Sequence, residues 1–166
     1  HARGDFAAAA ELHGRVLRIR RAALGEVHPL VAVSMVALGG ALLQQGDLTG
    51  AEEAHRQALA LRRRLFGEEH PLVAESLHHL AATLHTAGDL PGAEALYRQA
   101  LAMDRKLKGE EHRDVAVGST NLAFALAQQG RFEEAMPRFA RAVELNARVN
   151  APVHPLLARA LERQAA

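Results

Sequence analysis

The sequence of 166 residues contains no cysteine, which excludes disulfide bonds, thiolate metal sites and a cysteine nucleophile. This absence fits a reducing compartment, and we expect a cytoplasmic protein. Aromatic residues are scarce, with five Phe, one Tyr and no Trp. No apolar run approaches the roughly 20 residues that a membrane-spanning helix needs, and no signal peptide is visible. A membrane partner is therefore not predicted.

An excess of charge of one sign is also missing, because 20 Lys and Arg residues face 19 Asp and Glu residues, for a formal net charge of +1. No global field therefore attracts nucleic acid or an acidic membrane. Two arginine groups, one at Arg18, Arg20 and Arg21 and one at Arg62–Arg64, are expected at solvated C-terminal helix ends, where cations favour the helix dipole. They lack interleaved aromatic residues, so no nucleic-acid partner is predicted.

What the sequence does contain is a repeat with a period of 42 residues. Gly-Asp-Phe at 4–6 recurs as Gly-Asp-Leu at 46–48 and 88–90, and as Gly-Arg-Phe at 130–132. A second phrase keeps the same register: Gly-Glu-Val-His-Pro at 25–29, Gly-Glu-Glu-His-Pro at 67–71, Gly-Glu-Glu-His-Arg at 109–113 and Ala-Pro-Val-His-Pro at 151–155. The fixed spacing without insertions predicts a continuous repeat array.

Each period contains two breaks, which predicts two helices per period. In the phrase Gly-Glu-x-His-Pro, Gly suits the left-handed end of one helix and Pro suits the first turn of the next. In the phrase Gly-Asp-Leu, Gly again ends a helix and Asp can cap the following one. Apolar residues follow helical spacing between the breaks. The two stripes of the central period are Leu77, Leu80, Ala81 and Leu84, and Ala93, Leu96, Tyr97, Ala100 and Leu101.

We therefore predict an all-α protein, a single solenoid of antiparallel helix pairs over residues 1–166 with about eight helices. The second helix of a partial repeat occupies about 5–23, full repeats occupy about 25–66, 67–108 and 109–150, and a partial repeat occupies 151–166. The helices after the first are expected at about 29–45, 48–66, 71–87, 90–107, 113–129, 132–149 and 153–164. The chain lacks an initiator Met and opens in mid-period, so we expect a fragment of a longer protein.

These helix pairs resemble the tetratricopeptide repeat (TPR) family. The family pattern of the first helix, which is Leu, a small residue and a large residue, is met by Leu38-Gly39-Leu42, Leu80-Ala81-Leu84 and Leu122-Ala123-Leu126. The pattern of the second helix, which is Ala, an aromatic residue and Ala, is met by Ala51-His55-Ala58, Ala93-Tyr97-Ala100 and Ala135-Phe139-Ala142. The usual TPR period is about 34 residues, and the longer period with its Gly-Glu-x-His-Pro joint resembles repeats of the kinesin light chain type.

The resemblance implies a right-handed TPR superhelix whose first helices line a concave groove, and a scaffold that binds a peptide or helix of a partner protein there. In the kinesin light chain type, an Asn just before the first-helix Leu grips the peptide backbone. The matching residues are Ala37, His79 and Asn121. Some TPR domains clamp the carboxylate of a chaperone tail with Lys, Asn and Arg. The first three first helices have no Lys or Arg at these positions, which argues against that mode.

Helical geometry predicts which side chains face the groove. In chain order they are Val33, Val36, Ala37, Gly40, Gln44, Glu75, His78, His79, Ala82, His85, Val117, Thr120, Asn121, Phe124, Gln128, Arg159 and Arg163. The groove then grades from apolar, through histidine-rich, to basic. We expect a partner with apolar anchors at the first part and acidic or polar groups at the last.

The ten histidines invite a metal hypothesis, but their spacing argues against it. Four of them, His28, His70, His112 and His154, stand at the repeat joints and are expected to pack and hydrogen-bond there. On the central first helix, His78 and His85 are two turns apart, about 10 Å, which is too far to share an ion directly. Neither a metal nor a cofactor is predicted. The histidines of this face could instead make partner binding pH-sensitive.

A catalytic constellation is not evident, so an enzyme is not predicted. The Ser residues and carboxylates lie on regular helices without a positioned base. Gly39 and Gly40 lie inside a helix, where close packing of a neighbour explains them better than a phosphate loop does. The alternative to a binding module is structural self-association, because the half-repeats at both ends expose apolar faces that can stack. We expect a monomer or a weak homo-oligomer.

Overall fold

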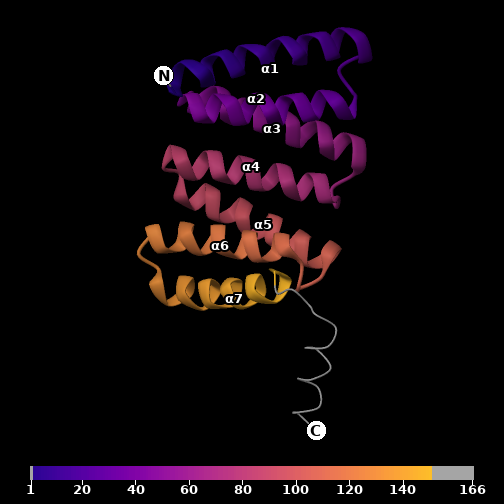
Figure 1. The fold of residues 1–166 in the computed structure, drawn as a ribbon. Coiled ribbons are helices and arrows are strands. Elements are labelled where there is room, and N and C mark those ends of the chain that lie inside the picture. The colour runs from indigo at the N-terminus through magenta and orange to yellow at the C-terminus, as the bar shows by residue number, and fades with distance from the viewer. Residues whose placement is uncertain (1, 151–166) are drawn as a thin grey trace.

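The computed structural model describes residues 2–150, which form seven α-helices stacked in chain order (Figure 1). They are α1 (Ala2–Leu24), α2 (Pro29–Gln45), α3 (Leu48–Phe66), α4 (Pro71–Ala87), α5 (Leu90–Lys108), α6 (Arg113–Gln128) and α7 (Phe132–Asn150). The all-α prediction is confirmed, and each predicted boundary lies within three residues of the observed one. The eighth predicted helix, at 153–164, lies outside the described residues.

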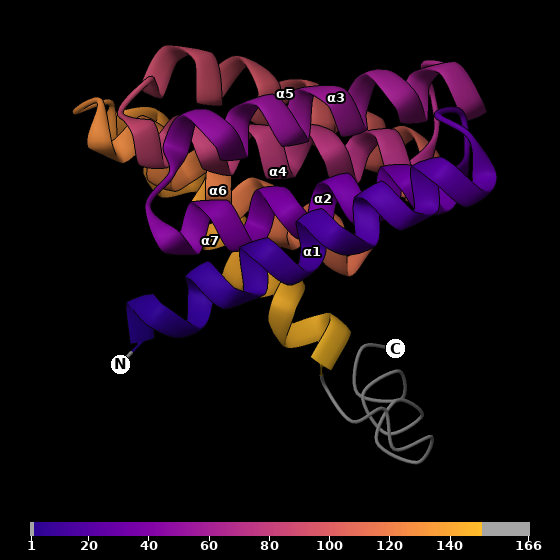
Figure 2. The ribbon, with the colours of Figure 1, turned by 90° about the horizontal axis from the view of Figure 1, so that it is seen from above.

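Each helix packs against its neighbours in the chain, and α2 also meets α4. Viewed along the stack, the second helices α3 and α5 follow one edge, and the first helices α2 and α4 lie on the other side of them (Figure 2). Contacts between consecutive helices are what a repeat solenoid requires. Within residues 2–150, no helix is long and apolar enough to cross a membrane.

The joint histidines cap helices. His28, His70 and His112 each accept a hydrogen bond through Nδ1 from the backbone N–H two residues later, at 3.1 Å. His154 lies outside the described residues. The glycine before each joint has a positive φ; Gly67, for example, has φ 84° and ψ 177°, a conformation essentially confined to glycine. The predicted hydrogen bonding of the three described joint histidines is confirmed, and Pro29 and Pro71 begin their helices as predicted. Gly67 and Gly109 end helices with positive φ, but their ψ values of 177° and 161° are not those of the predicted left-handed cap.

In two of the repeats, an aspartate at the second break caps the helix that follows. Asp47 and Asp89 accept hydrogen bonds from the backbone N–H three residues later, at 2.9 and 3.0 Å. Arg131 stands at this position in the third repeat, and its guanidinium reaches back to Glu94 on α5 at 2.6 Å. An interhelical ion pair therefore accompanies the third break, where the first two have a local cap.

The core follows the predicted apolar stripes. Every stripe residue of α4 and α5 is buried except Leu96, which is half-buried. Gly39 is required by packing, because a Cβ atom there would lie 2.5 Å from the ring of His55, whereas a Cβ atom on Gly40 would meet nothing within 4 Å. The packing explanation for this glycine pair therefore holds for Gly39 and not for Gly40.

The prediction that the arginines ending the second helices are solvated was wrong for Arg62, and Arg20 is half-buried. Arg62 is 3% exposed, and its guanidinium donates to the carbonyl of Leu72 at 2.7 Å and to the hydroxyl of Ser76 at 2.9 Å. Arg20 makes the same pair of contacts one repeat earlier, at 3.2 and 2.8 Å. Stacking of the next repeat buries this helix end, so the cation clasps the first turn of the following helix.

Candidate functional site

An open cleft of about 430 Å³ lies between α4 and α6, the first helices of two successive repeats, and the end of α5 closes it. Its lining residues are Pro71, Leu72, Glu75, His78, His79, Ala82, Asp104, Lys108, Asp114, Val117 and Asn121. We call it the α4–α6 cleft. Six predicted groove residues line it, namely Glu75, His78, His79, Ala82, Val117 and Asn121. These six side chains of α4 and α6 thus line a single cleft.

The joint between α5 and α6 differs from the two joints before it. Asp104, Lys108, Asp114 and Gly118 stand where the preceding repeat has Arg62, Phe66, Leu72 and Ser76. This joint therefore lacks the arginine clasp, by which we mean the contacts of Arg20 or Arg62 with the first turn of the next helix. It also lacks the serine partner and the two apolar residues. Three of the four replacing residues line the α4–α6 cleft.

A charge network takes the place of the clasp. His78 contacts Asp104 through Nε2 at 2.9 Å, and Lys108 donates to Asp104 at 2.7 Å and to Asp114 at 2.6 Å. Burial alone would raise the pKa of Asp104, but the hydrogen bonds with His78 and Lys108 outweigh it and lower that pKa below its usual value. A Cβ atom on Gly118 would lie 2.9 Å from the His78 ring, so the glycine makes room for this histidine.

Glu75, which lines the cleft, also contacts Arg62 and His79. Its Oε1 lies 3.2 Å from the guanidinium of Arg62 and 3.5 Å from Nε2 of His79. The hydrogen bond with His79 lowers the pKa of Glu75 most, burial opposes this change, and Arg62 lowers it further, to about 2. Glu75 is therefore ionised at neutral pH, with its side chain 47% exposed at the cleft.

His55 lies behind this wall of the cleft and is 2% exposed. Its ring stacks on that of His79, with 5.5 Å between centroids, and its Nδ1 contacts the Thr83 hydroxyl at 2.9 Å. The other ring nitrogen is buried without a hydrogen-bond partner among the described residues. Burial lowers the pKa of His55 to about 4, and nearby His79 adds to this effect. A neutral imidazole therefore supports the cleft wall at physiological pH.

The predicted groove residues of α2 do not line the cleft. Val33 is 46% exposed and Gln44 is also exposed, whereas Val36 packs against a core cluster. Ala37 and Gly40 are half-buried. Of the three residues that match the backbone-gripping Asn, only His79 and Asn121 line the cleft.

Four other predicted groove residues on α4 and α6 also lie outside the cleft lining. His85 is half-buried near the end of α4, and Gln128 is exposed. The Thr120 hydroxyl donates to the carbonyl of Ala116 in its own helix at 2.9 Å. The exposed Phe124 ring packs edge-on against the Phe139 ring of α7, with 4.9 Å between the ring centroids. Arg159 and Arg163 lie outside the described residues, so the basic end of the predicted groove has no structural account.

Five cleft residues were not predicted from the sequence, namely Pro71, Leu72, Asp104, Lys108 and Asp114. The groove was predicted on the inner faces of the first helices alone, whereas the first turns of α4 and α6 and the end of α5 also reach the cleft. Register comparison gives the missing signal, because Asp104, Lys108 and Asp114 replace Arg, Phe and Leu of the preceding repeat. Within residues 2–150, no group of three or more His, Cys, Asp or Glu side chains could hold a metal ion.

Comparisons with known proteins bear on the fold and the repeat type. Among solved structures, BtubC (BKLC) from P. vanneervenii is 26% identical over 89% of this chain, with a TM-score of 0.81, and the match covers 59% of that protein's chain. A structure from Podosopora anserina, of kinesin light chain nearly identical TPR-like repeats, is 26% identical, with a TM-score of 0.73, and 89% of this chain and 70% of that one are covered. A variant of that protein is 27% identical, with a TM-score of 0.75, and 88% and 69% are covered. No curated protein matches the chain.

Family models give the same assignment. One model for a tetratricopeptide repeat matches residues 1–64 and 35–106, and a second matches residues 84–160. The two-helix period, the small residues of the helix pairs and the long repeat joint all agree with these matches. The chain therefore belongs to the tetratricopeptide repeat family, with repeats similar to those of kinesin light chain-like proteins.

Proposed function

We propose that this protein is a non-enzymatic interaction module that holds an extended peptide or a helix of a partner protein in the α4–α6 cleft. TPR repeats are in general protein-interaction scaffolds. The observation that supports this site most is the cleft itself, which opens between the first helices of two repeats. Ligand sites are typically concave and mostly apolar, with a few polar groups that fix orientation.

The lining of the cleft meets this description. Pro71, Leu72, Ala82 and Val117 supply apolar surface, and Asn121 adds an amide that can both donate to and accept from a peptide backbone. His79, with its side chain 44% exposed, stands on the other wall. An extended chain between the two walls would therefore meet polar groups on both sides and apolar surface between them.

Peptide display tests this function directly. A random peptide library is selected on the wild-type protein, on the double variant Asn121→Ala, His79→Ala, and on a control with the exposed α5 substitution Gln99→Ala. We expect shared sequences to be enriched on the wild type and the control and to be lost on the double variant. Enrichment that survives in the double variant would place binding elsewhere, and no enrichment on any of the three would count against a peptide-binding role.

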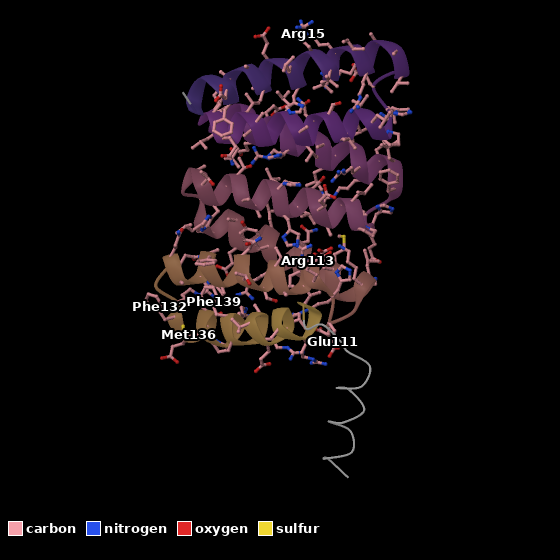
Figure 3. All side chains as sticks on the ribbon, in the orientation of Figure 1. Arg15, Glu111, Arg113, Phe132, Met136 and Phe139 are labelled. Atoms are coloured by element: carbon pink, nitrogen blue, oxygen red, sulfur yellow. The ribbon has the colours of Figure 1, made fainter. Side chains whose placement is uncertain are left out.

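Self-association is a second candidate function, and exposed apolar side chains support it. On α1, Leu12 and Ile19 are 57% and 65% exposed, and on α7, Phe132, Met136 and Val143 are 61%, 62% and 68% exposed. Figure 3 shows Phe132 and Met136 at the same end of α7, with Phe139 beside them. Exposed apolar faces of this kind, here on the first and last described helices, can stack on a second copy.

Sedimentation velocity over a range of concentrations tests this candidate. If α7 stacks on another copy, the sedimentation coefficient rises with concentration, and the substitution Val143→Lys removes the rise. Val143 is 68% exposed, so the lysine does not disturb the core of the single molecule. A coefficient that stays at the monomer value throughout would eliminate self-association, and a rise that persists in the variant would exclude α7 as the contact.

A further inference from the structure

Two carboxylates face the α4–α6 cleft from its two walls. Glu75 belongs to α4 and Asp114 to the first turn of α6, and their side chains are 47% and 46% exposed. Of the cations beside them, Arg62 is 3% exposed and does not line the cleft, whereas Lys108 lines it and pairs with Asp114. Three carboxylates, those of Glu75, Asp104 and Asp114, and one lysine line the cleft, so its formal charge with neutral histidines is negative.

Each of these carboxylates makes its protein contacts through one oxygen. Glu75 meets Arg62 and His79 through Oε1, and Asp114 meets Lys108 and His112 through Oδ2. Within residues 2–150, these contacts leave Oε2 of Glu75 and Oδ1 of Asp114 to accept hydrogen bonds from a ligand. A carboxylate accepts through both of its oxygens, so a ligand donor can be added without breaking the existing ion pairs.

The cleft that the two carboxylates line also has apolar surface. Val117 is 45% exposed and lines the cleft together with Leu72 and Ala82. A lysine or arginine side chain matches this combination, because its methylene stem can cover apolar surface while its charged head reaches a polar group. An acidic side chain would instead bring like charge to both walls.

Two of the lining carboxylates have lowered pKa values. The low pKa of Glu75, about 2, keeps this side chain ionised at neutral pH. Asp104, which is buried in the cleft lining, also has a lowered pKa, because its hydrogen bonds outweigh the effect of burial. A cation entering the cleft therefore meets Glu75 and Asp104 in their charged forms.

We propose that the α4–α6 cleft binds a lysine or arginine side chain of the partner peptide, with the cationic group between Glu75 and Asp114 and the stem on Val117. This inference rests on the proposed peptide-binding function and names the chemistry of the partner, a basic peptide segment. At α6 it differs from the acidic or polar partner group that was predicted with Arg159 and Arg163 as the basic end of the groove. The difference comes from Asp114, which was not among the predicted groove residues.

The same peptide selection tests this inference with carboxylate variants. One protein carries Glu75→Gln and Asp114→Asn, which remove the charge and keep a hydrogen-bond acceptor for the neighbours. The matched control carries Glu68→Gln and Glu110→Gln, which remove two exposed carboxylates that pair with arginines outside the cleft lining. Circular dichroism checks that each variant is folded, and Asp114→Asn alone serves if the cleft pair lowers stability. We expect Lys or Arg at one shared position of the peptides from the wild type and the control, and its loss with the cleft variant.

Titration of one selected peptide then gives the size of the effect. Replacing its basic residue with Gln is expected to weaken binding to the wild type about twofold to fivefold, as for a partly exposed ion pair, and to leave binding to the cleft variant unchanged. Selected peptides without a shared basic position, or equal weakening on both proteins, would overturn this inference and leave groove binding standing. If no peptide is enriched on any protein, the proposed function falls and this inference falls with it.

Discussion

Replacing His55 with Gln is expected to remove much of the acid sensitivity of the fold. Burial lowers the pKa of this imidazole from 6.5 to about 4. The unfolded chain therefore binds a proton near pH 6.5, whereas the folded protein binds it only near pH 4. Between these two values the unfolded state holds more protons, so the free energy of unfolding falls as the pH falls. The stabilisation is complete above pH 6.5 and is lost by pH 4.

The pKa difference sets the size of the effect. At about 1.36 kcal/mol for each pH unit, the change from 6.5 to about 4 corresponds to at most about 3 kcal/mol. The neighbouring His79 ring is 44% exposed, so solvent screens part of this interaction. We therefore expect about 2 kcal/mol. The Gln variant is less stable than the wild type at neutral pH, because it loses ring packing, and the gap narrows by this amount on acidification.

Urea unfolding followed by helical circular dichroism measures this gap at about pH 7.5 and about pH 4.5. Thr83→Val is the matched control, because it removes the hydroxyl that contacts His55 and leaves the ring buried. We expect the control to lose stability at both pH values and to keep the wild-type pH dependence. A gap between the wild type and His55→Gln that is the same at both pH values would refute the assignment of acid sensitivity to this residue.

Three further predictions concern stability and use the same unfolding assay. Gly40→Ala is expected to stabilise the protein by about 0.5–1 kcal/mol through helix propensity. Gly39→Ala is expected to destabilise it, because the added Cβ atom would lie 2.5 Å from the buried His55 ring. Equal effects of the two substitutions on the free energy of unfolding would contradict the packing explanation. Arg62→Ala is expected to lower the free energy of unfolding by about 2–3 kcal/mol, because it leaves a buried carbonyl and hydroxyl without their donor. Arg63→Ala, whose side chain is 32% exposed, is expected to lower it by less than about 1 kcal/mol. A similar loss of stability in both variants would argue against a stabilising role for the Arg62 contacts. Asp89→Ala is expected to cost about 1 kcal/mol by removing a helix cap, and an unchanged unfolding midpoint would show that the cap contributes nothing.

The helices could be predicted almost completely because their signals are local. A glycine with positive φ, a histidine or aspartate cap and the apolar stripe between them each act within a few residues, and the period repeats them. The burial of Arg62 could not be predicted in this way. A cation at a helix end suits the dipole whether it is solvated or buried, and only the stacking of α4 on α3 decides that Arg62 is buried.

The candidate site was predicted in part for a similar reason. Glu75, His79 and Asn121 lie on the helix faces that period and handedness assign to a groove, and all three line the cleft. The part played by Asp104 and Lys108 depends on where the end of α5 lies relative to α6, which single-helix geometry does not give. Comparing the repeats position by position marks these residues as departures from the pattern, and the packing then shows their place.

The Arg20 and Arg62 contacts, and the ion pairs that replace them between α5 and α6, have a consequence for the stability of the array. In a solenoid, each repeat is held mainly by its two neighbours, so every joint is a link in series. Two of the three described joints between repeats are closed by Arg20 and Arg62, and the joint between α5 and α6 is closed by ion pairs of Asp104 and Lys108. A ligand bound in the cleft would contact residues on both sides of this ionic joint. Partner binding would then stabilise the contact between these two repeats, and with it the whole array.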